Sequence, residues 1–197
     1  MATFTVTKIK TFLGMEGEGL NATICMDGVP ICFVLDDAHG GEVEYCYRNP
    51  KQNAASYNAT TPEMAAQAER DLGEYCLSLL SVEARATLEA EALQMKATWA
   101  PSVDVAAKMR ADAVETWVND YVDNLRVEKQ VRRTLAKKIA FTKVGKRGVW
   151  TLKAMAADVL AASLARPDLK ARLKDADVVL NLLPFDQAVR VFVEQSA

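Results

Sequence analysis

The sequence predicts an α+β protein: an N-terminal antiparallel β-meander followed by a mainly helical body with one basic β-hairpin. Through the first fifty residues, apolar and polar residues alternate in the pattern of half-buried strands. From Thr61 onward, apolar residues recur at helical spacing instead. Half of the 197 residues are hydrophobic, which is enough to form a core.

Four strands are expected in the N-terminal segment. Asp27-Gly28 is a two-residue hairpin signal, because glycine accepts the positive φ that such turns need. Gly40-Gly41 predicts a second turn, and the glycine-rich segment Gly14–Gly19 is expected to connect the first two strands. The alternating apolar residues that predict the strands are Phe4, Val6, Ala22, Ile24, Met26, Val29, Ile31, Phe33, Leu35, Val43, Tyr45 and Tyr47.

Three helices are expected after a polar linker over residues 49–60. Thr61-Pro62 begins the first helix, since threonine caps helices and proline suits the first helical position. Ser81 begins the second, which runs to Met95. The third is long, from about residue 103 to 140, and carries two apolar stripes, with a drift and a kink expected between them near Asn124.

The C-terminal part begins with a hairpin over residues 141–153. Its predicted turn is Val144–Gly148, and its returning strand contains Trp150. Residues 154–165 are alanine-rich and are expected to be helical, with short helices following toward Glu194.

This order of elements predicts two subdomains. Residues 1–50 would form the antiparallel sheet and residues 61–197 the helical part with its hairpin, or both would form one compact domain. No signal peptide and no apolar run long enough to span a bilayer is present in the sequence, so a cytoplasmic protein without membrane association is expected.

Cysteine usage agrees with a reducing compartment. The four cysteines contain no C-x-x-C pair, which argues against a zinc site. Each cysteine lies among apolar neighbours, so buried free thiols are expected. They are Cys25, Cys32, Cys46 and Cys76.

Positive charge is concentrated in one part of the chain. Between Arg126 and Lys153 there are ten basic residues and one acid, Glu128, so this stretch carries +9 in a chain of net charge −2. Such asymmetry predicts an anionic partner for one surface, or an acidic face elsewhere in the same chain. The basic residues are Arg126, Lys129, Arg132, Arg133, Lys137, Lys138, Lys143, Lys146, Arg147 and Lys153.

Eight of these residues form the candidate interface with nucleic acid or another partner. On the long helix they follow three- and four-residue spacing, opposite an apolar stripe, and others extend the charge into the hairpin. The alternative is a solvated face that docks on acidic parts of the chain. Trp150 could stack on a base or belong to the core. The eight residues are Arg126, Lys129, Arg132, Arg133, Lys137, Lys143, Lys146 and Arg147.

A second candidate site consists of acids around the only histidine. Asp36, Asp37, His39 and Glu42 lie within seven residues, and such side chains can bind Mg²⁺ or Mn²⁺ for phosphodiester hydrolysis. The alternative is an ordinary polar turn. His39 has no serine nearby and the chain has no G-x-S-x-G motif, which argues against a hydrolase triad.

No cofactor is expected. The glycine-rich segment Gly14–Gly19 lacks the lysine and the serine or threonine of a P-loop, and its two glutamates would repel phosphate. Its glycines do not follow dinucleotide-binding spacing either.

Two parts of the chain carry a recurring pattern. The first consists of Gly14-Met15-Glu16-Gly17-Glu18-Gly19-Leu20-Asn21-Ala22-Thr23, Asp27-Gly28, Val34-Leu35-Asp36-Asp37 and Gly40-Gly41-Glu42, and the second of Lys137-Lys138-Ile139-Ala140-Phe141 and Gly148-Val149-Trp150-Thr151-Leu152-Lys153. The first resembles the N-terminus of a group of phage- and prophage-encoded accessory proteins, and the second resembles a later segment of the same group. The resemblance implies a mobile-element protein that binds and blocks host machinery. It carries over no catalytic residue.

The leading functional hypothesis is therefore a non-enzymatic phage accessory protein in the cytoplasm of an infected or lysogenic bacterium. It would bind a host or phage macromolecule, either nucleic acid or a nucleic-acid-processing complex, and would inhibit a host defence system. The alternatives are a metal-dependent phosphoesterase or nuclease that uses the acid cluster, and a structural or assembly protein of a virion. The oligomeric state stays open.

Overall fold

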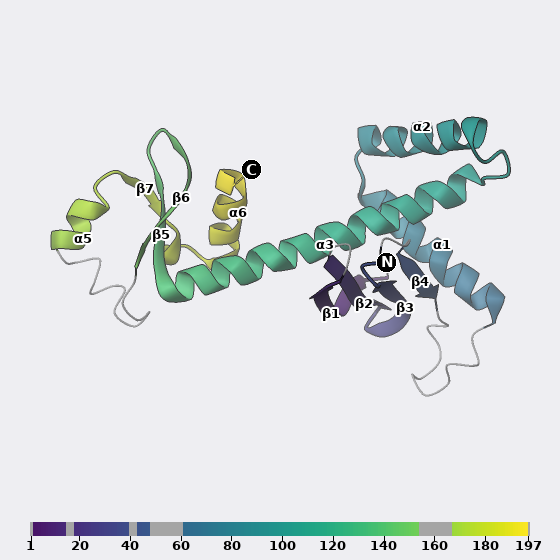
Figure 1. Ribbon diagram of the computed structural model, residues 1–197, viewed down its shortest axis with the longest axis horizontal. Helices are drawn as coiled ribbons and strands as arrows, with labels where there is room; N and C mark the ends of the chain where they lie inside the picture. The colour runs from purple at the N-terminus through teal and green to yellow at the C-terminus, as the bar shows by residue number, and fades with distance from the viewer. Residues whose placement is uncertain (1, 15–17, 40–42, 48–60, 154–166, 197) are drawn as a thin grey trace. The chain divides into compact units, whose positions relative to one another are not determined.

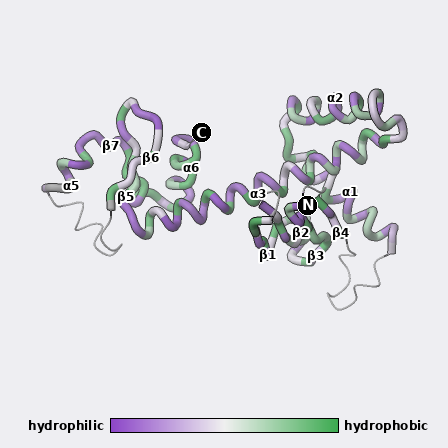
Figure 2. Tube along the Cα trace, in the orientation of Figure 1, coloured by the Kyte–Doolittle hydropathy of each residue, from purple (hydrophilic) through white to green (hydrophobic). Residues whose placement is uncertain are grey.

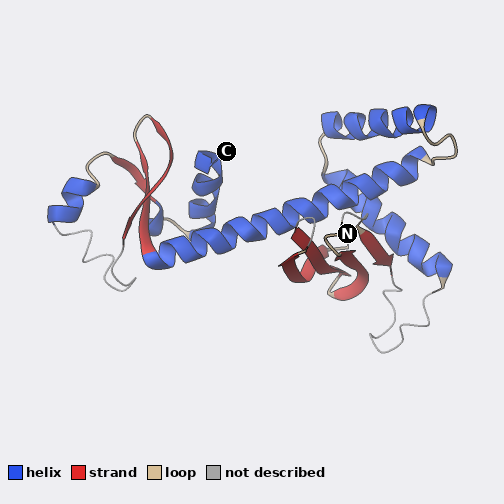
Figure 3. Ribbon diagram, viewed as in Figure 1, coloured by secondary structure: helices blue, strands red, loops and turns tan. Residues whose placement is uncertain are grey.

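The computed structural model describes residues 2–14, 18–39, 43–47, 61–153 and 167–196, and it confirms the α+β class (Figures 1 and 3). The chain divides into two compact units, unit 1 (Met1–Val122) and unit 2 (Asp123–Ala197). The boundary differs from the one expected between residues 50 and 61. It falls within the long helix because the first helices share a core with the N-terminal sheet.

Unit 1 begins with a four-stranded antiparallel meander in the order β1-β2-β3-β4. The strands are β1 (Phe4–Leu13), β2 (Glu18–Met26), β3 (Val29–Asp36) and β4 (Glu44–Tyr47). Asp27 and Gly28 form the turn between β2 and β3 with φ of 50° and 80°, as the hairpin signal predicts. Leu13 lies opposite Glu18, so the glycine-rich segment connects paired strands, as expected. The predicted Gly40-Gly41 turn and the linker over residues 49–60 lie outside the described residues.

Side-chain caps begin the three helices that follow. The Thr61 hydroxyl accepts a hydrogen bond from the Met64 N–H (3.4 Å) at the start of α1 (Pro62–Leu79). Ser81 does the same for α2 (Val82–Thr98) through the Ala84 N–H at 3.1 Å. The long helix α3 (Val105–Lys137) ends before the predicted residue 140, because the next residues belong to a strand.

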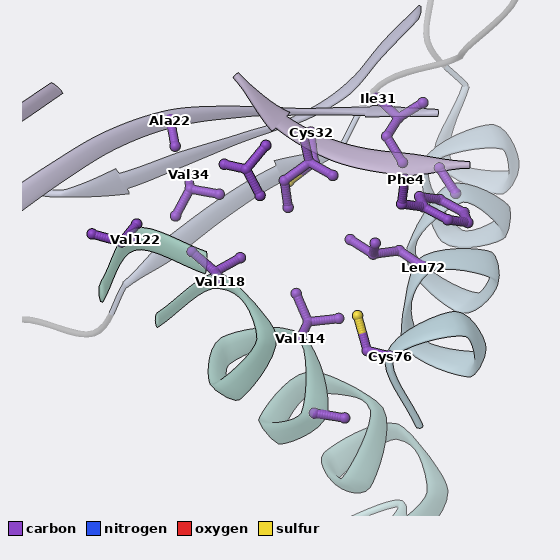
Figure 4. Close-up of a cluster of buried hydrophobic side chains, with 14 of the residues drawn as sticks. Phe4, Ala22, Ile31, Cys32, Val34, Leu72, Cys76, Val114, Val118 and Val122 are labelled. Carbon is purple, nitrogen blue, oxygen red and sulfur yellow. The ribbon is translucent and has the colours of Figure 1, made fainter. Parts of the chain in front are cut away.

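One face of the meander packs against α1 and α3 (Figure 4). Ile31 and Val34 of β3 belong to one buried cluster with Leu72 of α1 and Val114 of α3, and each of these side chains is at most 2% exposed. Burial of this apolar surface is the main stabilising contribution to unit 1. Sequence alternation is right for Phe4, Val6, Ala22, Ile24 and Ile31, but it is wrong in the second half of β3, where the predicted Leu35 is exposed and Val34 is buried instead. The pairing of β2 with β3 shifts register there, since Ile24 lies opposite Cys32 and Cys25 opposite Pro30, and such a bulge changes which residues face the core.

Unit 2 contains the C-terminal part of α3 and a three-stranded antiparallel sheet in the order β6-β5-β7. The remaining elements are β5 (Lys138–Lys143), β6 (Lys146–Lys153), α5 (Pro167–Arg172), β7 (Ala176–Val179), the 3₁₀ helix η3 (Leu180–Leu182) and α6 (Phe185–Ser196). The expected hairpin is therefore confirmed. The predicted helix over residues 154–165 lies outside the described residues.

The expectation of only short helices toward Glu194 is wrong at β7. Residues Ala176–Val179 pair with β5, with Phe141 opposite Val179 and Lys143 opposite Ala176. The strand has four residues, which is too short for its alternation to be distinguished from a helical pattern. Its pairing depends on a strand far away in the sequence, so a local pattern cannot indicate it.

The core of unit 2 confirms the second apolar stripe of the long helix. Val131 is fully buried with Ala140 of β5, Leu180 of η3 and Ala188 of α6. Other residues pack around them, and these are Val127, Leu135, Val149, Leu183, Phe185, Val189, Val191 and Phe192. Among the described helices of both units, none is long and apolar enough to cross a membrane.

Candidate nucleic-acid interface

The two units carry opposite charge. Unit 1 contains nine lysines and arginines against 18 aspartates and glutamates, a net charge of −9. Unit 2 contains 15 against eight, a net charge of +7. All eight residues of the candidate interface lie in unit 2 and form its basic surface. The structure therefore assigns the positive charge of the sequence to one folded unit.

The helical part of the basic surface is exposed. Lys129, Arg133 and Lys137 are exposed on α3, on the side away from the buried Val131. Figure 2 shows that hydrophilic and hydrophobic residues alternate along α3. Because they are four residues apart, successive side chains are spaced by about 6 Å along the helix axis. They form a row of cations on a rigid support.

Two arginines of α3 have contacts of their own. Arg126 forms an ion pair with Asp123, with Nη1 2.9 Å from Oδ1, one turn earlier in the helix. The Arg132 guanidinium lies 4.3 Å from the centroid of the Phe185 ring in a cation–π contact with α6. Arg132 is nevertheless exposed, so the same guanidinium can pack on a ring and face solvent.

The hairpin places lysines directly opposite each other. Lys143 is paired with Lys146 beside the turn. Like charges in opposed positions of an antiparallel pair destabilise it. The turn itself is Val144-Gly145, with Gly145 at φ +67°, so it is shorter than the predicted turn Val144–Gly148. The tight turn is what brings Lys143 and Lys146 into register.

Asn181 holds the helical part and the hairpin part of the basic surface together. Helix α3 ends at Lys137 and β5 begins at Lys138, without a connecting loop. The Asn181 Nδ2 group donates to the Leu135 carbonyl (3.1 Å) and the Lys138 carbonyl (3.0 Å). Its Oδ1 atom accepts from the Ala140 N–H at 2.8 Å. One side chain thus satisfies backbone groups on both sides of the junction.

Further hydrogen bonds hold the hairpin to the rest of unit 2. The Gln195 Oε1 atom of α6 accepts from the Gly148 N–H at 3.0 Å. The Thr142 hydroxyl of β5 accepts from the Val178 N–H of β7 at 3.2 Å. No local sequence pattern indicates that Asn181 and Gln195 support the basic surface, because both bind partners more than 40 residues away in the sequence.

Trp150 belongs to the packed sheet. It lies opposite the buried Phe141 in the β5–β6 register and is itself half-buried. The Lys143 ammonium is 5.3 Å from the centroid of its indole. Of the two interpretations of Trp150, this environment favours a core residue over a base-stacking platform.

The acid cluster forms local turn hydrogen bonds. Asp36 Oδ1 accepts from the Ala38 N–H at 2.9 Å, and Asp37 Oδ1 accepts from the His39 N–H at 3.0 Å. His39 Nδ1 is 3.6 Å from the other carboxylate oxygen of Asp37. Glu42 lies outside the described residues. Within the ranges that the structure describes, no three His, Cys, Asp or Glu side chains are arranged to hold a metal ion.

Buried thiols in unit 1 are held in the protonated form. All four cysteines are free, and Cys25, Cys32 and Cys76 are buried, as expected, while Cys46 is half-buried. Burial raises the pKa of Cys76 to about 12, and it raises the pKa of Cys32 further, with smaller contributions from Cys46 and Glu69. Cys32 and Cys76 therefore act as small apolar core residues rather than as nucleophiles.

No protein-family model matches the chain, and neither a curated protein nor a solved structure matches it. Functional assignment therefore depends on the basic surface and its supports.

Proposed function

We propose that this protein is a non-enzymatic nucleic-acid-binding protein and that the basic surface of unit 2 contacts the phosphate backbone. Cations on a surface bind nucleic acid mainly by releasing condensed counterions from the phosphates. The basic surface offers such cations on a helix and on a hairpin, and Asn181 fixes the junction between them.

The observation that carries the proposal is the pairing of lysine with lysine in the hairpin. The cross-strand pair Lys143–Lys146 costs stability in the free protein, on the order of 0.2–1 kcal/mol. A phosphate placed near both ammonium groups removes this repulsion. Binding of an anionic polymer therefore stabilises the Lys143–Lys146 pair, which is destabilised by charge repulsion in the free protein.

The variant Lys146→Glu tests this proposal with two measurements that are expected to change in opposite directions. Glutamate opposite Lys143 replaces repulsion by attraction, so the free energy of unfolding should rise, by up to about 1 kcal/mol. Nucleic-acid affinity should fall, roughly tenfold at low salt, because one phosphate contact is lost and a repulsive charge is added. Thermal unfolding and fluorescence anisotropy with labelled oligonucleotides measure the two effects.

The matched control is Lys170→Glu, on α5 of the same unit, which changes the net charge by the same amount outside the basic surface. Equal losses of affinity in the two variants would show that the net charge of the protein, and not the position of Lys146, determines the affinity. Undiminished affinity in Lys146→Glu would contradict the proposal.

The resemblance to phage-encoded accessory proteins supplies a setting for this activity. In that setting the protein would act in an infected or lysogenic bacterium by occupying nucleic acid that a host defence system must process. This part of the proposal rests on the residues that carry the resemblance.

A further inference from the structure

We infer that the nucleic acid bound at the basic surface is a double helix rather than a single strand. This inference rests on the proposed function and specifies its ligand. Three features of unit 2 support it: the placement of its aromatic rings, the rigidity of its cation rows and the shape of its hairpin tip.

Aromatic rings of unit 2 are engaged within the unit. Proteins that bind single strands stack successive bases on accessible aromatic side chains. Phe141 is 3% exposed and Phe192 packs in the core of unit 2. Phe185 lies beneath the Arg132 guanidinium and the Trp150 ring lies near the Lys143 ammonium. These are the four aromatic residues of unit 2, so its rings pack inward or carry the cations of the basic surface.

The cations are held on a fixed frame. Asn181 joins the end of α3 to β5, and Gln195 joins β6 to α6. A double helix is stiff, with a persistence length of about 50 nm, so its phosphates arrive already in place. A flexible single strand has to be ordered on binding and loses more entropy. A rigid row of cations therefore favours the rigid ligand.

The tip of the hairpin has the form of a groove-entering element. Val144 is 70% exposed in the two-residue turn, with Lys143 and Lys146 on the two strands beside it. A two-stranded β-ribbon fits the major groove of B-form DNA, which is about 12 Å wide. In that position, Val144 would face the bases while the two lysines meet phosphates at the groove edges.

Fluorescence anisotropy with the full-length protein tests the inference. The probes are a short DNA duplex, the RNA duplex of the same sequence, each separated strand, and oligo-dT of equal length, all at one low salt concentration. We expect at least one duplex to bind about tenfold more tightly than its own strands and oligo-dT, because a duplex has the higher phosphate density. Comparison of the DNA and RNA duplexes identifies which helix is preferred.

Failure of the inference and failure of the proposed function give different results. Oligo-dT that binds as tightly as both duplexes, or more tightly, would overturn the inference while nucleic-acid binding stands. No binding of any probe at low salt would overturn both.

A second test uses the fluorescence of Trp150. In a variant with Trp99→Phe and Trp117→Phe, Trp150 is the remaining tryptophan. Its emission should be unchanged at saturating oligo-dT, and strong quenching would also contradict the inference.

Discussion

Replacing Lys129, Arg133 and Arg147 together by glutamine is expected to weaken nucleic-acid binding by roughly 100-fold at low salt. The three side chains are exposed, two on α3 and one on β6, so each can contact phosphate without support from the core. The slope of log K against log salt should become less steep by about 3, since each lost contact removes about 0.9 of the slope. Anisotropy titrations at several salt concentrations measure both quantities.

The control for this variant is the triple replacement of Lys8, Lys10 and Arg70 by glutamine. These residues are exposed in unit 1, and the net charge changes by the same amount. We expect unchanged affinity, apart from a small long-range effect of charge. Neither variant should lower the melting temperature, because exposed substitutions of this kind usually change stability by about 0.5 kcal/mol or less. A salt slope that the first variant leaves unchanged would exclude these residues as phosphate contacts.

The second large effect is expected for Asn181→Ala. The variant removes hydrogen bonds to the Leu135 and Lys138 carbonyls and to the Ala140 N–H. Backbone groups left without partners in a half-buried site should cost unit 2 about 2–4 kcal/mol. Hydrogen exchange of the Ala140 amide should accelerate correspondingly, and nucleic-acid affinity should fall because the helix and hairpin parts of the basic surface are no longer fixed to each other.

Asn124→Ala is the matched control, since Asn124 is exposed on α3 in the same unit. Alanine is the better helix former, so this variant should be neutral or stabilising by a few tenths of a kcal/mol, roughly. If hydrogen exchange of the Ala140 amide is as slow in Asn181→Ala as in the control, Asn181 does not hold the junction between α3 and β5.

Local sequence signals predict much of this fold. Asp27-Gly28 requires positive φ at two successive residues, and Thr61 and Ser81 place their hydroxyls where the first helical N–H groups need acceptors. The spacing of Val131 against Lys129 and Arg133 likewise gives the exposed face of α3. In each case the interacting residues lie within a few positions of each other, so the local sequence is enough to predict the interaction.

Long-range pairing is what the sequence pattern does not contain. Asn181 accepts a hydrogen bond from the Ala140 N–H, 41 residues away in the sequence. Strand β7 forms because it pairs with the edge of β5. The opposition of Lys143 and Lys146 depends on a turn two residues long, whereas the glycines of the sequence also allow the longer turn that was predicted. The charge of the basic surface was therefore predictable, but the lysine pair and its support were not.

Lysine footprinting tests the central claim most directly, because it reports which unit meets the nucleic acid. The protein is acetylated under limiting conditions with and without saturating DNA duplex, and each lysine is quantified by mass spectrometry. We expect Lys129, Lys137 and Lys146 to be protected by the DNA. Lys10 and Lys96 of unit 1 are also exposed to solvent, and they should react as in the free protein. Protection confined to unit 1, or a reactivity of Lys129, Lys137 and Lys146 that DNA leaves unchanged, would contradict the assignment of the basic surface as the interface.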